Sequence, residues 1–403
     1  MKSSPTSCQD GRVVCLEQLS IDGIRNGVFN DPKLVGRGYR LINVVNLYGG
    51  STIDTSSLMR VDIGGDEFSR AKAAAGDLFF TRSSLKLEGI AKCNINVEEA
   101  DDITFDCHVM RVRPKKTEVL PEYLAAYCSS PPARRYFMEH AQQTTMTTIS
   151  QGVLGNLPVF LPPLPEQHRI AQILSCWDRA IEKVDTMIGK VAQEKAGLMS
   201  RLLSLAANRH YPKRQLGEFL IPTSYPVPKP ERSYYALSVR SHGKGTFSRY
   251  VEDPKSVAMD TLFSVKPNEL IVNITFAWEG AVAIVNLEDE GKLVSHRFPT
   301  YRFNEKVVSR EFFRHVIRTK RLVFYMGLIS PGGAGRNRVL NQKDLLSLEW
   351  PLPPVEKQVE VAHILNAIEK QRLLLERYKN ILRTQKQGLM ARLFAGESTG
   401  VAA

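Results

Sequence analysis

Two stretches of the chain, 163–206 and 354–395, repeat apolar residues every seven positions. Sustained heptads of this kind predict long helices that pack as a coiled coil. At 1.5 Å per residue each helix would span roughly 60 Å, which is longer than most helices in globular domains. We expect the two helices to pack on each other in antiparallel directions and to hold separate domains apart. One amphipathic core helix in each domain is the simpler alternative. The residues predicted to pack are Ile170, Trp177, Val184, Val191 and Leu198 in the first stretch and Val361, Ile368, Leu375, Leu382 and Leu389 in the second.

The two stretches are copies of one element. LPPLPEQHRIAQIL begins at Leu161 and LPPVEKQVEVAHIL begins at Leu352, an offset of 191 residues, and the same offset separates GLMSRL at Gly197 from GLMARL at Gly388. Each copy opens with prolines and an acidic residue, which suits the first turn of a helix; a polyproline ligand is the alternative. Lys195 interrupts the heptads of the first stretch. Three basic residues interrupt those of the second and are either solvated edges or contacts with a partner subunit: Arg372, Lys379 and Lys386.

The segments that precede the long helices, 1–162 and 207–353, predict two mixed domains. GDLFFTRSS (76–84) and NELIVNI (268–274) each predict a turn, a buried strand and polar residues at its exit. A helical segment at 120–140 is broken by two prolines, and 311–325 predicts one basic helix. Two loops of different chemistry lead into the long helices, QQTTMTTISQG (142–152) and SPGGAGRNRVLN (330–341). The predicted fold class is therefore α+β, with two mixed domains, two long antiparallel helices, an internal pseudo-two-fold repeat and a flexible tail at 396–403.

The positive charge is unevenly distributed along the chain. The formal net charge is +12, yet residues 1–162 hold 18 basic and 18 acidic residues, whereas residues 207–353 hold 22 basic and 14 acidic ones. A basic excess favours a polyanionic partner. No apolar stretch approaches the roughly 18 residues that a membrane span needs. The six cysteines lie in the first half without CxxC spacing, which favours reduced thiols in a cytosolic protein.

Motif fragments that would mark an enzyme are incomplete. The Ser-Pro-Pro-Ala at 130–133 lacks the amide or acid and the aromatic that grip a flipped base in amino-methyltransferases. GGAG at 332–335 lacks the Lys-Ser/Thr of a phosphate-binding P-loop. Glu231 with Asp253 and Lys255 only loosely matches a nuclease cluster, and the eight histidines show no paired ligand spacing. The sequence therefore predicts no catalytic residue and no metal ligand.

The repeated element resembles a known family. Pro162-Pro163-Leu164-Pro165-Glu166-Gln167 and Pro353-Pro354-Val355-Glu356-Lys357-Gln358, each followed by a long helix that ends in GLM-x-RL, are similar to the helix entries of the specificity subunits of Type I restriction–modification systems. GDLFFTRSS and NELIVNI with AWEGAV also look like strand motifs of that family's target recognition domains. The resemblance covers nearly the whole chain. The chain departs from the family pattern in the extra Pro165 and in the neutral first domain.

The resemblance implies a function. Each domain would read one half of a bipartite, asymmetric site in double-stranded DNA, and the helices would set the gap. The chain itself would bind no cofactor and do no chemistry. Two methyltransferase subunits would methylate adenine with S-adenosylmethionine, and restriction subunits would use ATP and Mg²⁺ to form the nuclease. Two alternatives are a self-contained methyltransferase or nuclease and a coiled-coil scaffold that binds no nucleic acid.

Candidate DNA contacts lie at the strand exits and in the loops that precede the helices. Arginine can pair two donors with guanine, and hydroxyl groups can bond to phosphates or base edges. The predicted contacts are Thr81, Arg82, Ser83, Thr145, Thr147 and Thr148 in the first domain and Lys244, Arg249, Asn273, Arg336 and Arg338 in the second.

Overall fold

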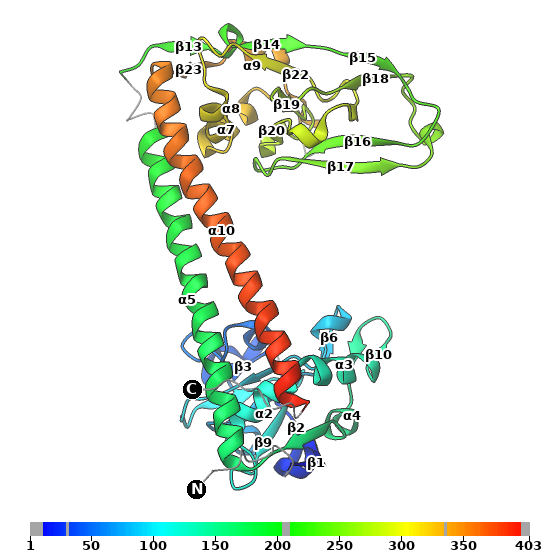
Figure 1. The fold of residues 1–403 in the computed structure, drawn as a ribbon, viewed down its shortest axis with the longest axis vertical. Coiled ribbons are helices and arrows are strands. Elements are labelled where there is room, and N and C mark those ends of the chain that lie inside the picture. The colour runs from blue at the N-terminus through cyan, green and yellow to red at the C-terminus, as the bar shows by residue number, and fades with distance from the viewer. Residues whose placement is uncertain (1–10, 30–31, 204–209, 334–336, 396–403) are drawn as a thin grey trace, which may run out of the picture. The chain divides into compact units, whose positions relative to one another are not determined.

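Both long helices are shared between two structural units (Figure 1). The computed structural model describes residues 11–29, 32–203, 210–333 and 337–395. Unit 1 comprises residues 1–187 and 375–403, and unit 2 comprises residues 188–374. Helices α5 (Leu164–Leu203) and α10 (Val355–Phe394) are each 40 residues long, and the offset of 191 residues relates them at both ends. The division therefore falls inside the helices, whereas the sequence placed the domain boundaries just before them.

Unit 1 is built around a four-stranded antiparallel sheet with the order β2-β9-β5-β7. A second sheet has the order β4-β3-β8, a small one has the order β10-β11-β6, and β1 pairs with β12. The strands are β1 (Arg12–Cys15), β2 (Ser20–Asn26), β3 (Val35–Ile42), β4 (Met59–Val61), β5 (Leu78–Thr81), β6 (Ser83–Ser84), β7 (Cys93–Ile95), β8 (Ile103–Phe105), β9 (Val109–Pro114), β10 (Gln142–Gln143), β11 (Thr147–Thr148) and β12 (Pro158–Leu161). The shorter helices are α1 (Gly65–Ala71), α2 (Pro121–Cys128), α3 (Pro131–Glu139) and α4 (Gln151–Gly155).

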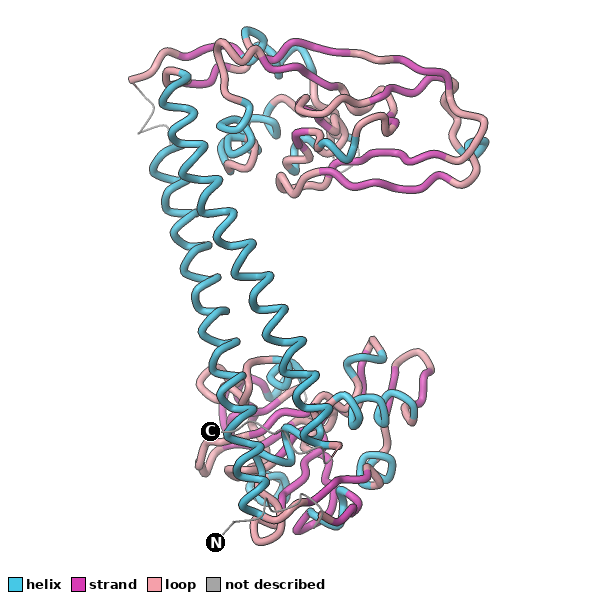
Figure 2. Tube along the Cα trace, in the orientation of Figure 1, coloured by secondary structure: helices cyan, strands magenta, loops and turns pink. Residues whose placement is uncertain are grey.

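Unit 2 repeats this plan. Its four-stranded sheet has the order β14-β22-β19-β20, its second sheet has the order β15-β18-β21-β16-β17, and β13 pairs with β23 as β1 does with β12. Figure 2 shows strands in magenta and helices in cyan in both units. The strands are β13 (Lys213–Gln215), β14 (Leu220–Thr223), β15 (Pro226–Pro228), β16 (Tyr234–Val239), β17 (Thr246–Val251), β18 (Thr261–Ser264), β19 (Leu270–Val272), β20 (Val282–Ile284), β21 (Leu293–Val294), β22 (Thr300–Phe303) and β23 (Glu349–Pro351). The shorter helices are α7 (Arg310–Val316), α8 (Lys320–Leu328) and α9 (Gln342–Ser347). The two units confirm the predicted α+β fold class and its internal repeat.

Two local predictions about helices had different outcomes. The break at 130–132 is present, because Ser130 caps α3 by accepting the Ala133 amide hydrogen while proline occupies the first turn. The single basic helix predicted at 311–325 is wrong. Two helices, α7 and α8, fill that segment, since Thr319 accepts the Leu322 amide hydrogen and starts a new helix. An N-cap residue favours the end of one helix and the start of the next over continuous helix.

Each unit closes its hydrophobic core with the ends of both long helices. In unit 1 the start of α5 (Ile170, Leu174) and the end of α10 join one buried cluster. The ring of Phe394 lies 5.6 Å from that of Tyr123 and 5.0 Å from that of Tyr127, both in edge-on contact. In unit 2 the reverse applies, because Leu203 at the end of α5 and the start of α10 join the second cluster. Each core therefore needs the last turn of the helix that begins in the other unit.

Ion pairs fix the antiparallel register of α5 and α10. In unit 1 Lys386 Nζ lies 2.5 Å from Asp178 Oδ1, and Lys379 pairs with Asp185 one heptad away on both helices. In unit 2 Lys195 of α5 lies 3.2 Å from Glu369 of α10. All three lysines thus bond across the helix pair. For Lys379 and Lys386 this outcome differs from both interpretations left open by the sequence.

The residues predicted to pack along the helices all avoid full exposure. Six are buried and four are partly buried; the buried ones are Ile170, Val184, Val191, Val361, Ile368 and Leu382, and the partly buried ones are Trp177, Leu198, Leu375 and Leu389. None of the described helices is both long enough and apolar enough to cross a bilayer.

A buried glutamine joins each long helix to the domain that precedes it. Gln358 Nε2 donates to Val307 O and to Pro353 O at 3.0 and 2.8 Å, and its Oε1 accepts from the Ser309 amide at 2.8 Å. Gln167 makes the same three bonds with Glu118 O, Pro162 O and the Leu120 amide, at 3.2, 2.9 and 2.8 Å. These bonds explain physically why both helix entries keep a glutamine at this position.

Candidate nucleic-acid interface

In unit 1 a small three-stranded sheet brings the two predicted contact segments together. The hydroxyl-rich loop folds as the hairpin β10–β11, and β11 pairs with β6, so that Thr148 lies opposite Ser83 and Thr147 opposite Ser84. Thr145 is exposed near the hairpin tip, Ser83 and Thr148 are partly exposed, and Thr147 is buried. The exit of β5 and the loop before α4 therefore lie side by side, although 63 and 65 residues separate the paired positions along the chain.

Thr81 and Asn273 end the central strands of their units, and both are buried. Thr81 Oγ1 donates to Gly89 O at 2.7 Å and accepts from the Lys92 amide at 2.9 Å. Asn273 Oδ1 accepts from the Thr275 amide at 3.1 Å. These hydrogen bonds hold the strand exits in shape. Like Thr147, both side chains are buried in this structure, and their contact with DNA stays a prediction.

The next residues along the chain take equivalent places in the two units. Arg82 in unit 1 and Ile274 in unit 2 each form backbone hydrogen bonds to two other segments of their own unit, and the pattern of bonds is the same in both units. The bonds are Arg82 N to His108 O (2.9 Å) and Ile149 N to Arg82 O (3.1 Å) in unit 1, and Ile274 N to Arg297 O (3.1 Å) and Leu340 N to Ile274 O (2.9 Å) in unit 2. Arg82 thus corresponds to Ile274, and His108 corresponds to Arg297. The backbone framework is repeated while the side chains on it differ.

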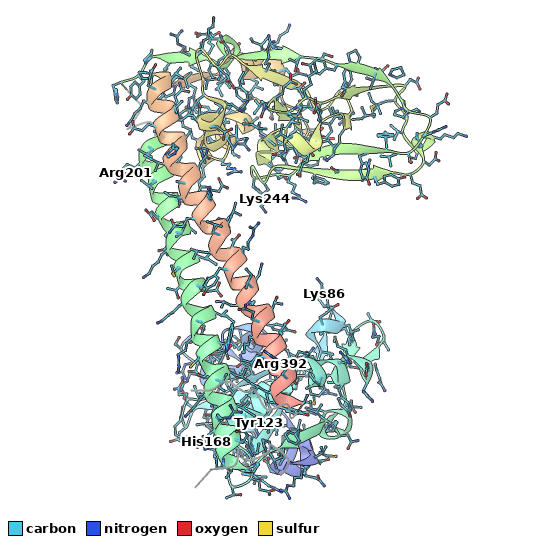
Figure 3. The ribbon with its side chains drawn as sticks, viewed as in Figure 1. Lys86, Tyr123, His168, Arg201, Lys244 and Arg392 are labelled. Atoms are coloured by element: carbon cyan, nitrogen blue, oxygen red, sulfur yellow. The ribbon has the colours of Figure 1, made fainter. Side chains whose placement is uncertain are left out.

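A groove in unit 1 brings residues that the sequence did not suggest next to Ser83, the neighbour of Arg82 in the chain. The groove has a volume of about 810 Å³ and is lined by the exposed residues Tyr48, Lys86, His108, Met146, Leu85 and Glu88 and by the partly exposed residues Ser83, Ser84, Val44 and Gly89. Lys86 extends from the tip that follows β6, away from the body of unit 1 (Figure 3), and Leu85 beside it is 86% exposed. Asp106 Oδ1 accepts the His108 amide hydrogen at 2.7 Å and so shapes the turn that carries His108. The sequence feature that could have indicated Lys86 is its position two residues beyond the end of strand β6.

In unit 2 the turn between β16 and β17 docks on the segment that follows β19. His242 N donates to Glu279 O at 2.8 Å, and Gly243 N donates to Gly280 O at 2.9 Å. Both residues have positive φ, 62° and 61°, and a side chain on Gly243 would also meet Arg318; these two features favour glycine there. Lys244 is exposed on this turn and projects from the edge of unit 2 (Figure 3).

Arg338 of unit 2 bonds to the end of α8 and to the start of the segment that follows it. Its guanidinium donates to Ser330 O at 3.1 Å and to Gly327 O at 2.7 Å, and it lies 5.2 Å from the ring centre of Trp278. This cation–π contact and the two hydrogen bonds give Arg338 a structural role beside its predicted DNA contact. Arg336 lies outside the described residues.

Two further basic residues of unit 2 are exposed. Arg249 lies on β17, opposite Ala236 of β16. Arg297, which the sequence did not suggest, is exposed and donates from Nη1 to Thr275 Oγ1 at 3.2 Å. The repeated backbone bonds place Arg297 at the position equivalent to His108. Because it is also exposed, Arg297 is a stronger candidate for a DNA contact than the buried Asn273.

Together these features define a class of protein: two copies of one scaffold, each with a different exposed set of basic, aromatic and hydroxyl side chains, joined by a helix pair. A family model described as the Type I restriction modification DNA specificity domain matches residues 74–188 and 261–383. The two matched regions cover more than half of the sequence. The chain belongs to this family, and it is a specificity subunit with two target recognition domains.

Two relatives agree with this assignment. A Methanocaldococcus jannaschii protein, assigned to the type I restriction enzyme MjaX as its specificity subunit, is 23% identical over 94% of this chain and 91% of its own length. The EcoKI specificity subunit of Escherichia coli strain K12 is 27% identical over 42% of this chain and 37% of its own.

Two solved structures share the fold. The S subunit of a Type I restriction–modification system from M. genitalium has a TM-score of 0.54 at 12% identity and covers 98% of both chains. A chain from a structural study of complex assembly and conformational transition of the type I R-M system has a TM-score of 0.59 at 16% identity, over 99% of this chain and 100% of its own.

Proposed function

We propose that each target recognition domain reads one half of a bipartite, asymmetric sequence in double-stranded DNA. The observation that carries this proposal is the repeated backbone framework with different exposed side chains. In unit 1 Lys86 and His108 line the groove and Arg82 is exposed next to Ser83, which also lines it, whereas Arg297 and Lys244 are exposed in unit 2. Two readers with unlike donors and acceptors would select unlike half-sites, because sequence is read through the hydrogen-bonding pattern of base edges.

The basic side chains would have two kinds of role. Arg82 and Arg297 are suited to bidentate pairing with guanine, since each lies beside a central strand whose exit is held by hydrogen bonds. Lys86 and Lys244 extend from turns and are suited to phosphate contacts, which position the duplex without reading it. Thr145, Ser83, Thr148 and Arg249 remain candidates as accessible residues. The other predicted contacts remain predictions: Arg336, Arg338 and the buried Thr81, Thr147 and Asn273.

The helix pair would set the distance between the two half-sites. Each 40-residue helix corresponds to about 60 Å. The interhelical ion pairs and the shared cores couple α5 to α10 at both ends, so that the length of the pair, rather than of one helix, would define the gap.

The helix pair would also bind the methyltransferase subunits. Apolar side chains of α10 that find no cover within the described residues include Leu373, Leu374, Tyr378 and Ile381, all about half exposed. Half-exposed apolar residues clustered on one stretch of helix favour a protein partner. We propose two methyltransferase subunits, which would methylate adenine with S-adenosylmethionine, and restriction subunits that would use ATP and Mg²⁺. This chain would contribute recognition and no catalysis, and the complex would act in the cytoplasm.

Motif mapping with single variants tests the proposal. The chain is expressed with its methyltransferase, and methylated adenines in host DNA are mapped by sequencing. Arg82→Ala is expected to relax one or two positions in one half-site, and Arg297→Ala in the other half-site, since a bidentate contact discriminates by about 1–3 kcal/mol. Arg70→Ala, an exposed arginine on α1, serves as the matched control. Unchanged motifs in both variants, or methylation by the isolated chain, would overturn the proposal.

A further inference from the structure

Unit 1 contains a cavity that lies apart from the groove beside Ser83. The cavity has a volume of about 260 Å³, and none of its lining residues lines that groove. Its walls come from the loop 50–52, β7, α2 and the two long helices. Polar and charged residues line much of it: the cations Lys92, Arg179 and Lys386, the acids Glu122 and Asp178, and the uncharged Thr52, Asn94 and Ser129. Such a cavity is large enough for a small polar ligand with water.

Lys92 is the feature of this cavity that demands an explanation. Its backbone is fixed, because its amide donates to Thr81 Oγ1 at 2.9 Å and its carbonyl accepts from the Thr81 amide at 3.1 Å. Burial is the largest cause that lowers the pKa of Lys92, and the positive charges of Arg134, Lys386 and Arg383 lower it further. A lysine in this environment has neither full hydration nor a favourable local field.

The neighbouring charges do not compensate Lys92. Lys386 is paired with Asp178, and Arg134 donates to three backbone carbonyls at 2.5, 2.8 and 2.9 Å. Glu122 lines the cavity from an exposed position on α2. Among the contacts of the described residues, the Lys92 ammonium forms no ion pair with a carboxylate. A partly buried cation among other cations is costly unless an anion neutralises it.

We propose that this cavity binds a phosphate group at Lys92. A phosphate would supply the anionic partner that Lys92 lacks, since Asp178 in the same cavity is paired with Lys386, and its oxygens accept several hydrogen bonds at once. The ammonium of Lys92 supplies charge, and the hydroxyl groups of Thr52 and Ser129 line the same space as further donors. The phosphate has two possible sources, a free phosphate or phosphate monoester in solution and the backbone of DNA. The site would exist whatever DNA sequence the protein reads.

Binding of inorganic phosphate to the full chain tests this site. Thermal shift and ³¹P line broadening are measured against sodium chloride of equal ionic strength. Phosphate is expected to raise the melting temperature of the wild type and of Lys183→Met, an exposed lysine of α5 that serves as the control. Lys92→Met should bind phosphate at least about tenfold more weakly, the loss expected for a hydrogen bond to a charged group.

Folding failure can be separated from loss of the site. Lys92→Met removes an uncompensated cation, so that without phosphate it should be at least as stable as the wild type. Lys92→Arg keeps the charge and should retain the phosphate response. Equal phosphate responses in Lys92→Met and the wild type, or no response in the wild type, would overturn the proposal. If the wild type does not bind phosphate but Lys92→Met binds the methyltransferase more weakly, the proposal is wrong and the cavity binds a carboxylate of a partner protein.

Salt dependence of DNA binding distinguishes the two sources of phosphate. If the DNA backbone occupies the cavity, Lys92→Met should reduce the slope of log K against log salt by about one unit, and phosphate should compete with DNA. If free phosphate occupies it, the slope should be unchanged and DNA should bind equally well with phosphate present. Both results require the Lys92-dependent phosphate response described above.

Discussion

Replacing the buried glutamine of either helix entry should destabilise one unit and spare the other. Gln358 is fully buried and makes three hydrogen bonds, to Val307 O, Pro353 O and the Ser309 amide. Leucine in its place fills most of the volume but leaves two carbonyls and one amide without partners. Each unsatisfied buried group costs about 1–3 kcal/mol. Since leucine regains some apolar burial, we expect Gln358→Leu to lower the stability of unit 2 by about 3–5 kcal/mol.

The same change in the first copy provides a reciprocal test. Gln167 is 1% exposed and makes the equivalent three bonds, so Gln167→Leu should destabilise unit 1 by a similar amount. The matched controls are Gln172→Leu on α5 and Gln371→Leu on α10, which are exposed and should change stability by less than about 0.5 kcal/mol.

Hydrogen exchange with mass spectrometry is the suitable assay because it reports each unit separately. For Gln358→Leu, protection should fall in peptides of β19, β22 and α7, and peptides of β5 and β9 should keep theirs. Gln167→Leu should give the reverse pattern. Losses below about 1 kcal/mol in both variants, or equal losses in both units for each variant, would refute the reasoning that these glutamines join helix to domain.

Two further predictions concern the helix pair and pH. Reversing the charge of Asp185 opposite Lys379 should cost about 0.5–1 kcal/mol, since the aspartate is half exposed and water screens the pair; Asp185→Lys with Lys379→Asp should recover most of this loss in a double-mutant cycle measured by urea denaturation, and a merely additive effect would contradict the assigned register. Burial lowers the pKa of His315, whose Nε2 bonds to Asn366 Oδ1 at 2.8 Å. Above the ordinary histidine pKa of about 6.5, His315 is neutral in both the folded and the unfolded protein. Below it the unfolded protein binds a proton at this histidine more readily than folded unit 2 does, so the stability of unit 2 decreases as the pH is lowered. The urea midpoint of unit 2 should therefore drop more between pH 7.5 and 5.5 in the wild type than in His315→Gln, and equal drops would contradict this.

The sequence was sufficient for those features that repeat or that follow local rules. Heptad spacing and the duplicated helix entry predicted α5 and α10, because a long amphipathic helix leaves its period in the sequence. The prolines at 131 and 132 predicted the break before α3 for the same local reason. Both ends of α5 and α10 differ by the same 191 residues, because both copies of the helix pack against a domain core in the same way.

Features that depend on contacts between distant segments were not predictable. The sequence does not show that Thr81 and Asn273 point inward, because polar residues at strand exits are commonly exposed. It does not show that Lys379 meets Asp185, since their pairing requires the antiparallel register. The correspondence of His108 with Arg297 appears only in the backbone bonds of the folded units.

The length of the helix pair offers the most direct test of the account. Seven residues are inserted in α5 between Met187 and Ile188 and seven in α10 between Leu374 and Leu375, so that the antiparallel register is kept. This lengthens the pair by about 10 Å, or roughly three base pairs at 3.4 Å each. Mapping of methylated adenines should then reveal two unchanged half-sites with a gap longer by roughly three base pairs. Methylation at the original spacing, or altered half-sites, would contradict the account.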